Sequence, residues 1–99
     1  MTFYEATFGD ETCYVRVESR PSGRGAVFVA TPYVLDTEIL YWFPNGQGRA
    51  IEVPGASEEA VLWIVARFLT ARFGSQTAPF RPAELRKFAL QQALPTRPR

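Results

Sequence analysis

The 99-residue chain contains no histidine, one cysteine (Cys13) and one lysine (Lys87). Because histidine is the usual general base near neutral pH, its absence excludes the serine–histidine and cysteine–histidine nucleophiles and the histidine-bearing zinc sites. Cys13 has no second cysteine with which to form a disulfide, and its place in an alternating apolar run is typical of a small buried side chain. We therefore expect a protein that is not an enzyme and that uses no cofactor and no metal.

Long apolar runs are also lacking. The longest one that the sequence offers covers residues 60–66, which is too short to cross a bilayer. No basic and then apolar leader follows Met1, and ten arginines against one lysine indicate a GC-rich, bacterial type of genome. The expected location is the cytoplasm, with no membrane contact.

What the chain does have is enough apolar material for one core. Hydrophobic residues make up 46% of the sequence and aromatic residues 14%, which is ordinary for a globular protein. A chain of this length leaves no room for a second core. We expect a single domain over residues 1–94 and a mobile tail over the Pro- and Arg-rich residues 95–99.

The first half of the chain alternates apolar or β-branched residues with polar ones, and its runs end in residues that favour turns, which predicts strands. The predicted strands are Thr2–Phe8, Thr12–Ser19, Ala26–Thr31, Thr37–Phe43 and Arg49–Val53. Their connections are short, except for a more apolar one over residues 32–36. Short connections favour an antiparallel, meander-like sheet.

The period changes after residue 56 to that of a helix. Ser57 is a good N-cap, two acidic residues follow it, and Gly74 stands where a left-handed C-cap belongs, so a helix is predicted over Glu58–Phe73. Residues 75–81 are interpreted as a linker, and Pro82 begins a second, weaker helix that ends by Leu94. The predicted fold class is α+β: a five-stranded antiparallel sheet followed by two C-terminal helices, the first packed on the sheet.

Trp63 is out of place in this helix. Most apolar residues of the helix fall on one broad face, but Trp63 falls between Glu59 and Arg67 on the polar stripe. Either the second helix packs over Trp63, or Trp63 is an anchor for a binding partner.

Charge is unevenly distributed along the chain. Residues 1–59 hold four basic and nine acidic residues, a net charge of −5, whereas residues 60–99 hold seven basic residues and one acidic residue, a net charge of +6. A basic helical surface of this kind is a candidate site for an acidic protein or for phosphates. The same arginines also suit helix ends and a solvated surface. The candidate contacts are Trp63, Arg67, Arg72, Arg81, Arg86 and Lys87.

Two of the predicted strands are apolar on both faces, around residues 26–30 and 39–43. A sheet with one face in water shows polar residues at alternate positions, so something should cover the second face. A helix, curling of the sheet, a ligand or a second copy of the chain would each do so. We expect a second copy, and the candidate dimer face contains Phe28, Tyr41 and Phe43.

The sequence thus favours a small, non-catalytic protein–protein interaction domain that forms a homodimer through an apolar sheet face. The first alternative is binding of single-stranded nucleic acid, with the arginines on phosphates and Trp63 or a sheet aromatic stacked on a base. The second alternative is binding of a small apolar ligand in an aromatic-lined groove.

Overall fold

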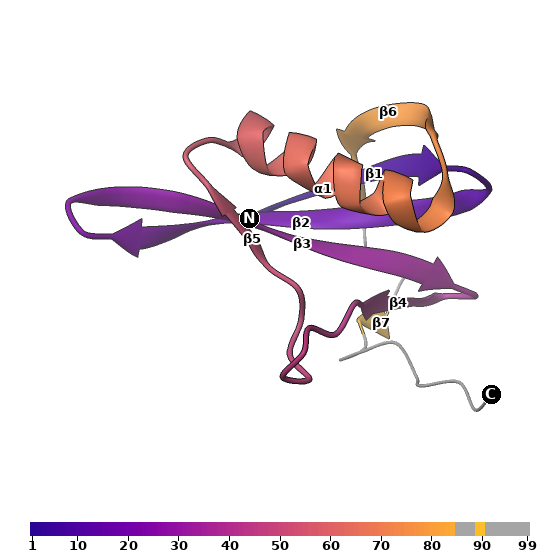
Figure 1. Cartoon of the computed structure of the whole chain (residues 1–99), viewed down its shortest axis with the longest axis horizontal. Coiled ribbons are helices and arrows are strands. Elements are labelled where there is room, and N and C mark those ends of the chain that lie inside the picture. Colours follow the sequence, from indigo (N-terminus) through magenta and orange to yellow (C-terminus); the bar gives the residue numbers. More distant parts are fainter. Residues whose placement is uncertain (85–88, 91–99) are drawn as a thin grey trace.

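A computed structural model describes residues 1–84 and 89–90, and in this part of the chain one helix lies across one face of a mostly antiparallel sheet (Figure 1). The strands follow the order β6-β1-β2-β3-β4-β7, and β5 pairs with β3. Among the described strands, the β4–β7 pair alone is parallel. The elements are β1 (Thr2–Phe8), β2 (Glu11–Ser22), β3 (Gly25–Asp36), β4 (Ile39–Trp42), β5 (Val53–Gly55), α1 (Glu58–Phe73), β6 (Gln76–Pro82) and β7 (Ala89–Leu90).

The α+β class, the antiparallel order of the first four strands and the first helix are confirmed. β1 and α1 have the predicted bounds. The Ser57 hydroxyl accepts a hydrogen bond from the Ala60 N–H at 3.1 Å and caps the helix. Gly74 has the expected positive φ of 119°, but its ψ of −179° directs the chain into β6 instead of a left-handed helical cap.

β3 is longer than predicted. The apolar residues 32–36, which we interpreted as a connection, continue β3 and pair with β2, with Val34 opposite Cys13 and Tyr33 opposite Tyr14. Both Tyr33 and Val34 are buried, so the gain from burying them explains why this segment is strand. The predicted strand Arg49–Val53 lies too early in the sequence, because the observed strand β5 begins only at Val53.

The prediction for the C-terminal part is wrong wherever the structure describes it. Residues 76–82 form β6 rather than a linker, Pro82 ends that strand rather than beginning a helix, and Ala89–Leu90 are β7. The outer edge of β1 explains this result, because it offers N–H and C=O groups to a further strand and an edge strand tolerates Pro79. The remaining residues of the predicted helix, 85–88 and 91–94, and the predicted tail over 95–99 lie outside the described residues.

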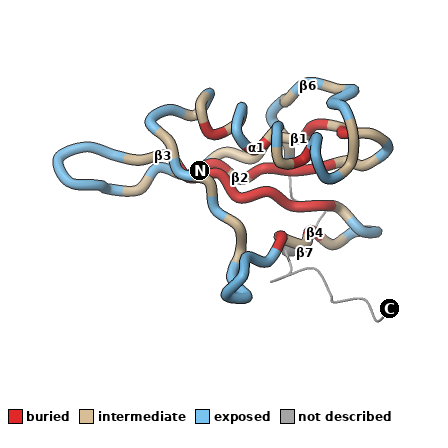
Figure 2. The backbone as a smooth tube through the Cα atoms, viewed as in Figure 1, coloured by how far each residue is buried: buried red, intermediate tan, exposed pale blue. Residues whose placement is uncertain are grey.

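Both faces of the sheet are packed. On one face Val61, Val65 and Leu69 of α1 are fully buried against apolar side chains of β1, β2 and β3. Figure 2 shows the long buried stretches of β2 and β3 in red. On the opposite face Tyr14 and Tyr33 are 5% and 3% exposed and pack with Leu40, Phe3, Leu35, Trp42 and Ala83. The apolar character of both faces of β3 and β4 is therefore accounted for within the chain.

The β1–β2 turn is fitted closely against the end of α1. Gly9 has a φ of 57°, and a Cβ atom added there would lie 2.2 Å from the Phe73 carbonyl oxygen. The Gly9 N–H donates a hydrogen bond to the Ser75 carbonyl at 2.9 Å. Since Ser75 directly precedes β6, this contact aligns β6 with β1.

Substitution of Gly9 should therefore lower the stability by more than the cost of placing a side chain at a positive φ. We expect Gly9→Ala to lower the free energy of unfolding by more than about 2 kcal/mol, because a positive φ costs an alanine ~1–2 kcal/mol and the added methyl group meets backbone. Gly23→Ala is the matched control, since Gly23 has a φ of 58° but nothing within 4 Å of an added Cβ. Equal losses for the two variants in urea denaturation would contradict the close fit.

Candidate interaction surface

Trp63 lies on the outer side of α1 and its side chain is 62% exposed. The buried residues of α1 follow one another at four-residue spacing and face the sheet, which leaves Trp63 on the opposite side of the helix. The expectation that a second helix packs over Trp63 is therefore wrong. Large exposed aromatic side chains are frequent anchors of protein interfaces.

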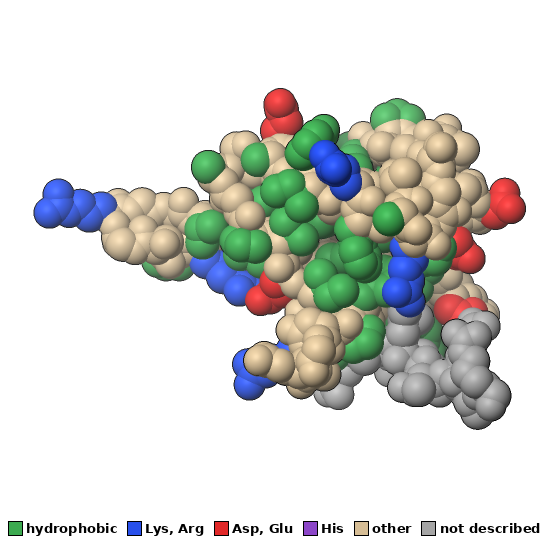
Figure 3. Space-filling model, in the orientation of Figure 1, with side chains coloured by type: hydrophobic (Ala, Val, Ile, Leu, Met, Phe, Trp, Pro, Cys, Tyr) green, Lys and Arg blue, Asp and Glu red, His purple; other side chains and the backbone are tan. Residues whose placement is uncertain are grey.

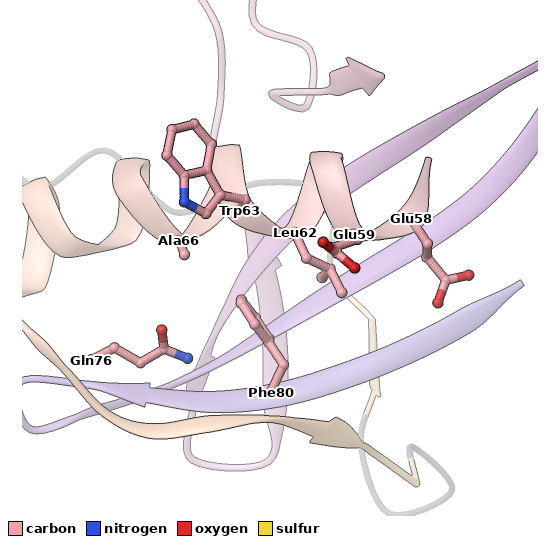
Figure 4. A pocket seen from close by; sticks show the side chains of 7 residues that line it. All are labelled: Glu58, Glu59, Leu62, Trp63, Ala66, Gln76 and Phe80. Atoms are coloured by element: carbon pink, nitrogen blue, oxygen red, sulfur yellow. The ribbon is translucent and has the colours of Figure 1, made fainter. Parts of the chain in front are cut away.

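Trp63 forms the rim of an open groove of about 510 Å³ between α1 and β6 (Figure 4). From α1 come Leu62 and Ala66, and from β6 comes Phe80, which points toward the helix. Glu58, Glu59 and Gln76 complete the lining. The groove exists because β6 pairs with β1 and thereby runs beside α1.

One acidic side chain of the groove is held from the sheet. The Tyr4 hydroxyl donates a hydrogen bond to the Glu58 carboxylate. This bond is the main cause that raises the pKa of Tyr4, and burial is the second cause. Glu59 is exposed and forms no ion pair with any described residue. The end of the groove nearest the start of α1 is therefore acidic.

The predicted basic residues do not gather into one patch. The Arg67 guanidinium lies 5.0 Å from the centre of the Trp63 ring, and that of Arg72 lies 5.2 Å from the centre of the Phe43 ring. Arg81 pairs with Glu5 at 3.1 Å. On the face seen in Figure 3, basic side chains are scattered around a broad apolar area. Arg86 and Lys87 lie outside the described residues.

The predicted dimer face lies under the helix. Phe43 is 1% exposed, with its ring centre 5.4 Å from that of Phe68 and 6.0 Å from that of Phe73. Phe28 and Tyr41 pack against the same core cluster. The alternation of β3 and β4 puts all three side chains on the α1 side, where Phe43 belongs to the core and Phe28 and Tyr41 stay partly exposed.

Sequence reasoning missed the part of the groove that β6 supplies. The sequence does place the apolar residues Ala78 and Phe80 at alternate positions, and the structure partly buries both while Thr77 and Pro79 are exposed. That alternation is typical of a strand, but two prolines in seven residues suggested a linker. The pairing of β6 with β1 joins residues more than 65 positions apart, which no local pattern reveals.

Neither a metal-binding cluster nor an accessible thiol is found in the described part of the chain. Residues 1–84 and 89–90 contain no group of three or more histidine, cysteine, aspartate or glutamate side chains that would hold a metal ion. Cys13 is fully buried, as predicted, and burial raises the pKa of its thiol to about 12. Arg16 Nε and Thr31 Oγ1 are buried without a hydrogen-bond partner among the described residues, but they lie on the face of the sheet away from the groove.

No family model matches the chain, and no curated protein or solved structure matches it either. Among the described residues, no helix is both long and apolar enough to cross a membrane.

The buried thiol makes a direct prediction. At pH 8, Cys13 in the folded chain should react with iodoacetamide at least ~100-fold more slowly than in denaturant, because the thiol is both protonated and enclosed. Ser22→Cys, in the exposed β2–β3 hairpin, supplies an accessible thiol in the same fold as a control. Equal labelling rates for Cys13 and the introduced cysteine would show that the core around β2 is open.

Proposed function

We propose that this chain is a non-catalytic protein–protein interaction domain whose contact surface is the outer side of α1 together with the groove between α1 and β6. The observation that carries the proposal is the 62% exposure of Trp63 at the rim of that groove. A half-exposed indole beside Leu62 and Phe80 gains most when a partner excludes water from all three.

The shape and charge of the groove favour a protein as the partner. Pockets for small molecules enclose most of their ligand, whereas this groove is open along the helix and Trp63 at its rim is largely exposed. A protein surface gains contacts beyond the groove, for example with Ile64, which is 41% exposed. This argument also weighs against the small apolar ligand.

Binding of single-stranded nucleic acid has less support. Glu58 and Glu59 line the groove whose rim Trp63 forms, and they would repel phosphates there. Arg81, one of the predicted phosphate contacts, is paired with Glu5. The non-catalytic part of the proposal is supported by the absence of histidine from the sequence and by the enclosed thiol of Cys13.

Replacement of Trp63 should remove binding without unfolding the chain. An immobilised wild-type chain is compared with Trp63→Ser for the proteins that each retains from a lysate of the source cells. We expect at least about 30-fold weaker binding for Trp63→Ser, since loss of a central anchor costs ~2 kcal/mol or more. Arg24→Ser, at the exposed tip of the β2–β3 hairpin, should bind as the wild type does. Retention of the same proteins by Trp63→Ser would contradict the proposal.

A labelled single-stranded oligonucleotide should show no change in fluorescence anisotropy with the wild-type chain at about 50 mM salt. The acidic end of the groove and the scattered arginines are the reasons for this expectation. Binding that weakens steeply between about 50 and 200 mM salt would favour the nucleic-acid alternative instead.

A further inference from the structure

The middle of α1 is nearly symmetric about Trp63. Residues 59–67 read EAVLWIVAR. Apart from the two ends, residues at equal distances before and after Trp63 are identical or similar. Ala60 matches Ala66, and Leu62 matches Ile64. The outermost pair, Glu59 and Arg67, is opposite in charge.

The structure places the outward members of this segment where a partner can reach them. Glu59, Trp63 and Arg67 are exposed and follow one another at four-residue spacing, so they form one ridge along α1. Ala60 and Ala66 lie on the two sides of this ridge and are only partly exposed. Ile64 is 41% exposed, whereas Val61 and Val65 are buried against the sheet.

From this arrangement we propose that two copies of the chain pair through the outer side of α1, with the two helices antiparallel about a twofold axis at Trp63. In an isologous pair each residue meets its mirror position on the other copy. Glu59 of each copy then meets Arg67 of the other, and Ala60 meets Ala66. This inference rests on the proposed function and names its partner as a second copy.

Charge complementarity favours a second copy over an unrelated partner. Neither Glu59 nor Arg67 forms an ion pair with any described residue, so both are available. Arg67 already lies over its own Trp63 and can keep that contact while it meets a carboxylate. Trp63 lies at the twofold axis and meets Trp63 of the other copy, and the small alanines beside it leave room for the two indoles between the helices.

Pairing of two copies through the β6 edge of the sheet is disfavoured by comparison. β6 is one edge of the sheet, and its Pro79 and Pro82 have no N–H to donate to an added strand. A dimer through α1 rests on one helix of 16 residues, about 24 Å long. It buries less area than a standard interface, so we expect a reversible dimer with a Kd on the order of micromolar.

Sedimentation equilibrium over a wide concentration range tests the pairing. The wild-type mass should rise from 11.1 kDa toward twice that value. Glu59→Arg and Arg67→Glu each place like charges opposite one another, and each should weaken self-association at least tenfold. An equimolar mixture of these two variants should form dimers again, because every facing pair in the mixed dimer has opposite charges.

Two control variants carry the same charge changes away from α1. Arg24→Glu lies at the tip of the β2–β3 hairpin and Glu38→Arg in the β3–β4 turn, and both positions are exposed. Each should dimerise as the wild type does. Recovery in the mixture also shows that the single variants are folded, since unfolded chains would not be rescued by charge.

Three results would overturn the inference: a wild-type chain that stays monomeric, single variants that dimerise like the wild type, or a mixture that does not recover. A monomeric wild type whose bound proteins are still lost on Trp63→Ser refutes the homodimer and leaves the proposed function standing. If Trp63→Ser changes neither the mass nor the retained proteins, both proposals fail.

Discussion

The close contact between the β1–β2 turn and the end of α1 fixes how the two layers of this fold meet. Gly9 approaches the Phe73 carbonyl so closely that only glycine fits, and its N–H binds the Ser75 carbonyl. The chain leaves this point through Gly74 in an extended direction and pairs with the free edge of β1. The groove beside Trp63 depends on β6 lying there, because Gln76 and Phe80 of β6 line it.

Local sequence patterns were sufficient to predict α1 and the order of the first four strands. The bounds of α1 follow from Ser57 and Gly74, and alternation together with short turns gave the antiparallel order of β1 to β4. The C-terminal part was mispredicted because its structure depends on partners far away in the sequence. Proline-rich β6 becomes a strand only beside the edge of β1, and neither its prolines nor its short apolar pattern reveals that edge.

The candidate site shows the same division. The pattern of α1 marked Trp63 as unusual, but only the fold shows that its side chain is largely exposed. Alternation indicated that both faces of β3 and β4 are apolar, and yet which aromatics face α1 depends on strand register. Phe43 lies beneath α1, whereas Tyr33 and Trp42 lie on the other face. With both faces packed, attention moves from the sheet to the outer side of the helix.

The account's central claim is that α1 meets its partner through the ridge of Glu59, Trp63 and Arg67. The most direct measurement is a dilution series of backbone amide spectra by NMR. The account predicts that resonances of residues 59–67 move with concentration, while those of the β2–β3 hairpin, residues 18–27, stay fixed. Spectra that do not change, or changes confined to the hairpin or to the sheet face away from α1, would contradict it.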